Sequence, residues 1–224
     1  MNKQVAKSDN KLQTSVTAWG AGESIDKQDI LIPKINLLQP LSELVQDNKA
    51  KAGEFVENVN QTVLGKKVTF LAFGHFKTLQ VWENHKWKKT ISWEPQFQEL
   101  PFEQLVSGVV THNVKVLNYY VLLPSELAKG IAFPYVLPFK KTGTRAGKKL
   151  ATIFTKLKLF KAPSAAKVFT LTASLTENDK GKFWVPDVME IRNSSAEEVA
   201  AAKKWHDGLT TAKVQVKEDE EDVK

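Results

Sequence analysis

The stretch TRAGKKLATIFTKLKLF, residues Thr144–Phe160, changes the hydrophobic period of the chain and decides its fold. Apolar residues recur in it at helical spacing, and four cationic residues fall together on the opposite side. The stretch therefore predicts an amphipathic helix with a cationic face. The apolar positions are Leu150, Ile153, Phe154, Leu157 and Phe160, and the cationic ones are Arg145, Lys148, Lys149 and Lys156.

Strands are predicted on both sides of this helix. After Pro163 apolar and polar residues alternate through Leu175, the turn sequence NDKG follows at 178–181, and residues 182–188 return as a hairpin partner. Before the helix, runs rich in β-branched and aromatic residues predict further strands. These runs are 68–76, 79–93, 113–123 and 131–139, and the first two are expected to form a hairpin. Pro134 and Pro138 confine the last run to a sheet edge or a bulge. Residues 94–111 are expected to form a loop or a short helix.

A last helix is expected after the final hairpin. Ser194 or Ser195, followed three residues later by Glu197 or Glu198, makes a capping box that opens a helix through about Leu209. The predicted class is mainly β with helices (α+β). Five or six antiparallel strands with one helix before the last hairpin is the order of an OB-fold barrel. An immunoglobulin-like sandwich competes, but it needs no long cationic helix in mid-chain.

Composition limits the function. The 224 residues include no cysteine, which excludes disulfides, thiol nucleophiles and cysteine-bound zinc or iron–sulfur sites. No apolar run approaches the length of roughly 20 residues that spans a bilayer, and the polar start has no signal-peptide core. We therefore expect a cytoplasmic protein, in the host cytoplasm if it is viral. Residues 1–29 are predicted to be a flexible arm with an uncertain role for Trp19, 30–211 one OB-like nucleic-acid-binding domain, and 212–224 a disordered acidic tail.

Charge is distributed unevenly along the chain. The net charge is +7, but residues 214–224 carry two lysines and five acids, which is −3, so residues 1–213 carry +10. Residues 127–176 contain ten Lys or Arg and no acid. Like charges repel each other at helical spacing, so a region with cations alone is more typical of a surface that binds a polyanion than of an ordinary solvent-exposed face. An anionic membrane surface is the weaker alternative, since the apolar helix face is needed for the core.

Aromatic residues accompany a second basic stretch, VWENHKWKKTISW at 81–93. A cationic groove with rings on which bases stack is how single strands are bound, although each tryptophan could equally belong to the core. With only Arg145 and Arg192 available for guanine reading, phosphate charge is expected to dominate. The predicted stacking residues are Trp82, Trp87, Trp93, Tyr119 and Tyr135, and the predicted phosphate contacts are Lys86, Lys88, Lys89, Arg145, Lys148, Lys149 and Lys156.

Catalytic and metal motifs are not found. Residues 143–149 (GTRAGKK) approach a phosphate-binding loop but are one residue short of GxxxxGK[ST], with Lys149 in place of the hydroxyl residue. The four histidines have no metal-binding spacing, and Asp179 and Asp187 suit a turn and a strand end. We expect no enzyme activity, no cofactor and no metal.

The basic barrel with VWENHKWKK, the cationic helix and the terminal EDEED together resemble the single-stranded DNA-binding proteins of tailed bacteriophages. The resemblance covers roughly 65–224 and implies that the barrel binds the strand. It also implies that the acidic tail recruits replication or recombination proteins and competes with DNA for the groove. Such tails commonly finish with a hydrophobic or aromatic residue, whereas this one ends in Val223-Lys224. The tail residues concerned are Glu218, Asp219, Glu220, Glu221 and Asp222.

The expected function is sequence-nonspecific binding that coats transient single strands during phage DNA replication or recombination. Two alternatives stay open. One is a strand-annealing recombination protein, which needs stable rings or filaments. The other is a non-enzymatic protein-binding module that occupies a host factor.

Overall fold

A computed structural model describes residues 31–179 and 181–211 of the chain. The predicted N-terminal arm, Trp19 and the predicted acidic tail lie outside these residues.

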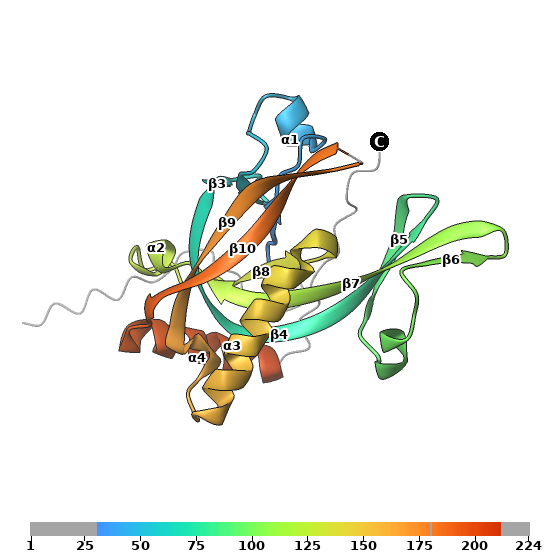
Figure 1. Ribbon diagram of the computed structural model, residues 1–224. Coiled ribbons are helices and arrows are strands. Elements are labelled where there is room, and N and C mark those ends of the chain that lie inside the picture. The colour runs from blue at the N-terminus through green and yellow to red at the C-terminus, as the bar shows by residue number, and fades with distance from the viewer. Residues whose placement is uncertain (1–30, 180, 212–224) are drawn as a thin grey trace, which may run out of the picture.

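Five strands of a seven-stranded antiparallel sheet form a curled half-barrel (Figure 1). Their order across the sheet is β10-β9-β4-β7, with β8 paired to the other side of β7, and the helix α3 stands between β8 and β9 in the chain. This is the strand order and helix position of an OB-fold, so the predicted fold class is confirmed. The strands are β4 (Lys67–Glu83), β7 (Val109–Leu122), β8 (Tyr135–Phe139), β9 (Lys167–Asn178) and β10 (Gly181–Asn193).

Residues 31–41, which we call the lead-in, lie along the free edge of β8. Among the described long strands, β8 pairs only with β7. The backbone N–H of Val136 donates to the carbonyl oxygen of Pro33 at 2.8 Å, and Lys34 and Val136 form an isolated parallel β-bridge. A small second sheet follows, and the short helix α1 (Glu43–Gln46) lies between its first two strands in the chain. These strands are β1 (Ile35–Leu37), β2 (Phe55–Glu57) and β3 (Val63–Gly65).

A two-hairpin arm extends from one end of the barrel, where β5 (Lys86–Ser92) pairs with β4 and β6 (Glu103–Val106) pairs with β7 (Figure 1). The predicted break between 76 and 79 is wrong, because β4 runs unbroken from Lys67 to Glu83. The turn comes at Asn84 and His85, which both have positive φ, as a two-residue hairpin turn requires. Residues 94–111 hold the short helix η2 (Pro95–Gln98), β6 and the start of β7.

The helix α3 (Thr144–Leu159) has the predicted bounds within one residue and packs on the inner face of the sheet. It follows the short turn η3 (Lys141–Gly143). Its side chains Leu150, Phe154 and Leu157 are buried, whereas Phe160 lies beyond its end and is 82% exposed. The predicted apolar face therefore ends one turn earlier than the sequence indicated.

The helix α4 (Ala196–Thr211) covers the other face of the sheet. The predicted capping box is formed by Ser195 and Glu198, whose side chains bond each other's backbone N–H groups at 3.2 and 2.8 Å. Because alternate strand residues point to opposite faces, Phe70 joins the inner core with α3 while Leu71 joins the outer one with α4. Two further short helices are α2 (Pro124–Leu127) and η4 (Ser164–Ala166).

Candidate nucleic-acid interface

One tryptophan and two lysines meet where the arm leaves the barrel. Trp82 is near the end of β4, Lys140 follows β8, and Lys141 opens η3. The ammonium nitrogens of Lys140 and Lys141 lie 5.9 and 5.2 Å from the centre of the Trp82 ring, which is within cation–π range. Lys141 has a positive φ of 50°, so the chain turns sharply here. The fold thus brings together a ring and two cations that are almost 60 residues apart in sequence.

The same two lysines line an open cavity of about 470 Å³ between the lead-in, the end of β8 and the start of β10. Lys182, Phe183 and Trp184 of β10 line it as well. Three cations and two aromatic rings around one opening can take phosphates and unstacked bases. We refer to the following six residues as the Trp82 surface: Trp82, Lys140, Lys141, Lys182, Phe183 and Trp184.

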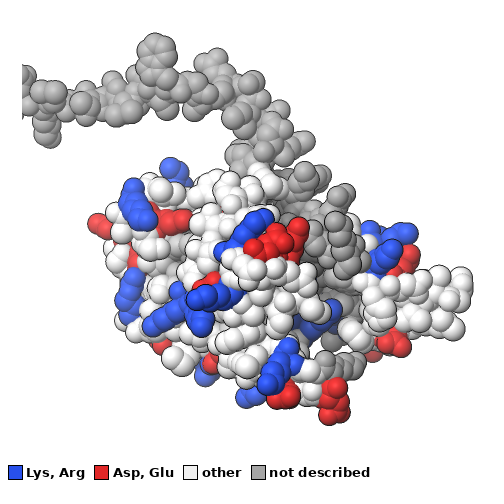
Figure 2. Space-filling model, turned by 90° about the horizontal axis from the view of Figure 1, so that it is seen from above, with Lys and Arg blue, Asp and Glu red and all other residues white. Residues whose placement is uncertain are grey.

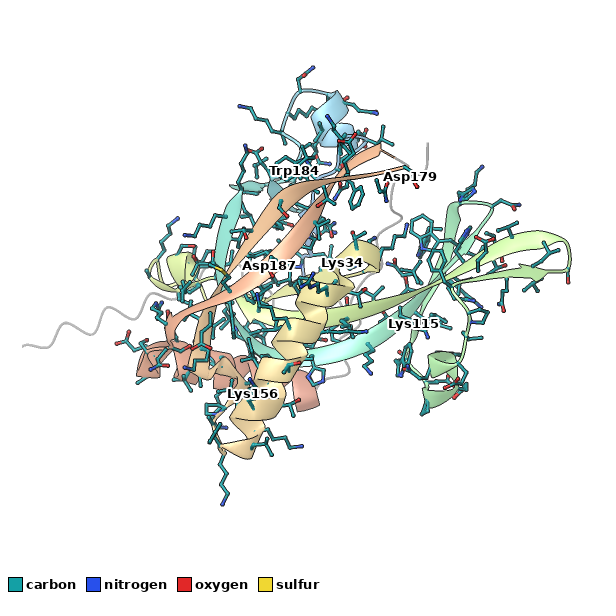
Figure 3. All side chains as sticks on the ribbon, viewed as in Figure 1. Lys34, Lys115, Lys156, Asp179, Trp184 and Asp187 are labelled. Carbon is teal, nitrogen blue, oxygen red and sulfur yellow. The ribbon has the colours of Figure 1, made fainter. Side chains whose placement is uncertain are left out.

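Trp184 is held in place from the lead-in. The side-chain amide of Gln39 donates to the carbonyl oxygen of Trp184 at 2.9 Å and accepts from its backbone N–H at 2.8 Å. The indole ring lies over Gly53, which has a φ of +87° and on which an added Cβ would be 2.6 Å from the ring. A side chain at position 53 would therefore displace the ring. Figure 3 shows Trp184 on the upper part of β10.

A second aromatic and cationic group lies at the base of the arm. The nitrogens of Lys77 and Lys115 lie 5.3 and 6.0 Å from the centre of the Trp93 ring. Phe97 packs edge-on against the same ring with centroids 6.1 Å apart, and Lys115 donates to the carbonyl oxygen of Gln98 at 2.6 Å. Lys115 is labelled in Figure 3. Trp93 thus lies within cation–π distance of two lysines and is also packed against Phe97 within the arm.

The remaining predicted residues of the arm lie on β5. Trp87 is opposite Trp82 in the β4–β5 register, and its indole N–H donates to the Thr90 hydroxyl at 3.3 Å. Lys86 and Lys89 are exposed, and Lys88 pairs with Glu83 at 3.3 Å. An exposed pair of this kind adds little to stability, so a phosphate could replace the carboxylate.

Two predicted stacking residues are in the core, which corrects that part of the prediction. Tyr119 is 1% exposed and donates to the carbonyl oxygen of Gly147 at 2.6 Å. Tyr135 is 8% exposed and donates to the Glu126 carboxylate at 2.8 Å. Burial raises the pKa of Tyr119 to about 12. Strand alternation points both rings inward, so neither can stack on a base in this fold.

The predicted cationic residues of α3 are spread along the helix. Arg145 and Lys148 are exposed in its first turns, next to η3, whereas Lys156 is exposed near its far end (Figure 3). Lys149 pairs with Asp187 of β10 at 3.1 Å. At about 1.5 Å per residue, Lys156 is roughly 18 Å from the start of the helix. The predicted phosphate contacts therefore divide into an arm group and a helix group.

Several residues of the Trp82 surface, and the two lysines near Trp93, were not among the predicted stacking residues or phosphate contacts. They are Lys77, Lys115, Lys140, Lys141, Lys182, Phe183 and Trp184. Their positions depend on strand register and on the approach of β8 to β10, which no local pattern encodes. Figure 2, seen from above Figure 1, shows Lys and Arg in separate groups with acidic side chains among them.

Within 31–179 and 181–211, no three His, Asp or Glu side chains are grouped so that they could hold a metal ion. No helix of this part of the chain is long and apolar enough to cross a membrane.

Comparison with known proteins matches part of the chain to a phage protein family. Residues 4–98 match a family described as Pam3 phage gp34-like protein. The matched segment runs from the N-terminal region through β4 and β5 to the end of η2, which is less than half of the 224 residues. No curated protein and no solved structure matches the chain. The family match supports a bacteriophage origin for this OB-like protein.

Proposed function

We propose that this protein binds single-stranded DNA without sequence preference and coats transient single strands during phage DNA replication or recombination in the host cytoplasm. The observation that carries the proposal is the Trp82 surface, where Lys140 and Lys141 join the Trp82 ring to the cavity beside Trp184. It lies between the arm, which connects the first two barrel strands, and the last hairpin. OB-folds bind oligonucleotides on the face between these two connections.

Bases and phosphates are bound by different side chains in this proposal. Unpaired bases stack on the rings of the Trp82 surface, each for about 1–3 kcal/mol, and lysines contact the phosphates. A duplex keeps its base faces stacked, so the rings favour single strands. Sequence preference is not expected, because lysine is a point charge and Arg192, one of only two arginines, is bonded to Glu198 at 2.6 Å. Binding of this kind needs no catalytic group or cofactor.

The proposal is tested by removing the two central lysines. Lys140→Gln with Lys141→Asn removes both charges, and asparagine tolerates the positive φ at 141. Since each lost phosphate contact lowers the slope of log affinity against log salt by about 0.7, the double variant should lose about 1.4 from the slope with oligo(dT). The control Lys129→Gln/Lys204→Gln removes two exposed charges elsewhere and should keep the slope. Equal slopes for all three proteins would contradict the proposal.

A second candidate, strand annealing by an assembly of subunits, is favoured by the edge strand β6. Among the described strands, β6 pairs only with β7, and Leu105 and Val106 beside its open edge are 72% and 48% exposed. Open edges can pair with another copy of the chain. Light scattering after size-exclusion chromatography distinguishes the two: a monomer with and without oligonucleotide argues against annealing, and a stable ring or filament supports it.

A further inference from the structure

A second cavity lies on the opposite side of α3 from Asp187. It has a volume of about 1030 Å³ and is bounded by the second half of α3, the β4–β7 sheet near Gly74, and α4. Aromatic side chains of Phe73, Tyr120 and Phe154 form part of its wall, and Lys158 and Lys161 are exposed cations at its edge. We call it the α3 cavity.

The wall of the α3 cavity suits a nucleotide. The Phe73 and Tyr120 rings are stacked with centroids 6.0 Å apart, and His75 lies edge-on to Phe154 at 6.0 Å. Phe73 and Phe154 are themselves buried, so the rings that a base can reach are those of the half-buried Tyr120 and the exposed His75. The β-bulge between Ala72 and Gly74 re-aims the side chains of β4 at this point. No acidic residue is among the described residues that line the cavity. Aromatic faces beside cations, without competing carboxylates, are the chemistry that binds single-stranded nucleic acid.

A polar stripe on α3 connects the two binding surfaces. At 100° per residue, Arg145, Lys148, Thr152, Thr155 and Lys158 form one oblique row that ends at the α3 cavity, where Thr155 and Lys158 line the wall. Lys149 points to the other side and pairs with Asp187. The helix contains no acid, and it begins directly after Lys141 and Gly143, which line the cavity of the Trp82 surface. Its 16 residues span about 24 Å.

We propose that the α3 cavity is a second contact site for the same single strand. This inference rests on the proposed function. A long strand leaves the Trp82 surface, follows the stripe on α3, and places a nucleotide in the α3 cavity with its phosphates at Lys158 and Lys161. A short oligonucleotide occupies the Trp82 surface alone, so the second site contributes only when the strand is long enough to reach it.

The test compares oligo(dT) of about 6 nucleotides, near the lower end of the OB-fold site sizes of about 4–16, with oligo(dT) of about 20, which exceeds them. The variant Lys158→Gln/Lys161→Asn removes both lysines of the α3 cavity, with asparagine chosen because Lys161 has a φ of 53°. The control is again Lys129→Gln/Lys204→Gln. For the long strand the log–log salt slope should fall by about 1.4 in the variant and stay unchanged in the control. For the short strand, variant, control and parent should agree.

The outcomes separate the two proposals. Failure of the parent protein to bind either oligonucleotide overturns the proposed function and this inference together. Binding by the parent with no effect of the variant on the long strand overturns only the second site. An equal loss for the short and the long strand also overturns it, because the two lysines would then act on the first contact. Thermal melting of each variant checks that the fold is kept.

Discussion

Trp82 is the side chain whose removal should weaken binding most directly through stacking. Its ring is partly exposed, and two lysine nitrogens lie 5.2 and 5.9 Å from its centre. If one base stacks there, Trp82→Ala loses about 1–3 kcal/mol, which corresponds to roughly 5- to 150-fold weaker binding. The lysines remain, so the salt slope should not change. Loss of affinity at constant slope would separate stacking from charge.

Trp82→Phe controls for damage to the fold. The indole N–H is buried and has no acceptor within the described part of the chain, so phenylalanine keeps an aromatic face without losing a hydrogen bond there. Its affinity should lie between those of the parent and Trp82→Ala. The assay is fluorescence anisotropy of a labelled oligo(dT), with thermal melting of each protein. If the affinity of Trp82→Ala is within about twofold of the parent's and the two proteins melt at the same temperature, stacking on this ring is refuted.

Three further results are expected. Deleting residues 214–224, which carry a net charge of −3, should tighten oligonucleotide binding, most at low salt, because a tethered acidic segment competes with phosphate. Equal or weaker binding of the truncated protein in fluorescence anisotropy would make the tail a solubility segment. Hydrogen bonds from Arg192 hold the pKa of Glu198 below its ordinary value of 4.5, so its stabilising contribution is full above that pH and is lost as the pH falls through the lower, folded pKa. Glu198→Gln should therefore flatten the acid limb of the melting temperature, and an unchanged limb would argue against it. Gly147→Ala would put a Cβ 2.9 Å from the Cβ of Phe139 and should lower the free energy of unfolding, measured in denaturant, by about 1–3 kcal/mol. The control Gly208→Ala has open space around the new Cβ and should not destabilise the fold. Equal effects of the two substitutions would contradict the packing of α3.

Periodic patterns in the sequence were enough to predict the central fold. The helical spacing of Leu150, Phe154 and Leu157, the alternation before the NDKG turn, and the Ser195–Glu198 capping box are local signals, and each predicted element is present. The strand boundary near 76 was wrong, because the turn depends on positive φ at Asn84 and His85, which are less common in that conformation than glycine.

The candidate site could be predicted only in part. Trp82 and Trp93 were found because aromatic and basic residues alternate within one stretch. Tyr119 and Tyr135 were misplaced, since composition does not say which face of a strand is buried. Lys140 comes near Trp82 through the pairing of β7 with β8, and Lys182 and Trp184 share a cavity with Lys140 through the position of β10. Such long-range contacts leave no mark in the local sequence.

The proposed function depends on binding of single strands through stacking and phosphate charge. A titration of the parent protein with poly(dT), followed by tryptophan fluorescence at several salt concentrations, tests it most directly. We expect quenching at saturation and a log affinity that falls linearly with log salt, by about 0.7 for each contacted phosphate. With Lys140, Lys141 and Lys182 at the Trp82 surface, the slope should have a magnitude of at least about 2. Unchanged fluorescence together with an affinity that does not vary with salt would contradict it.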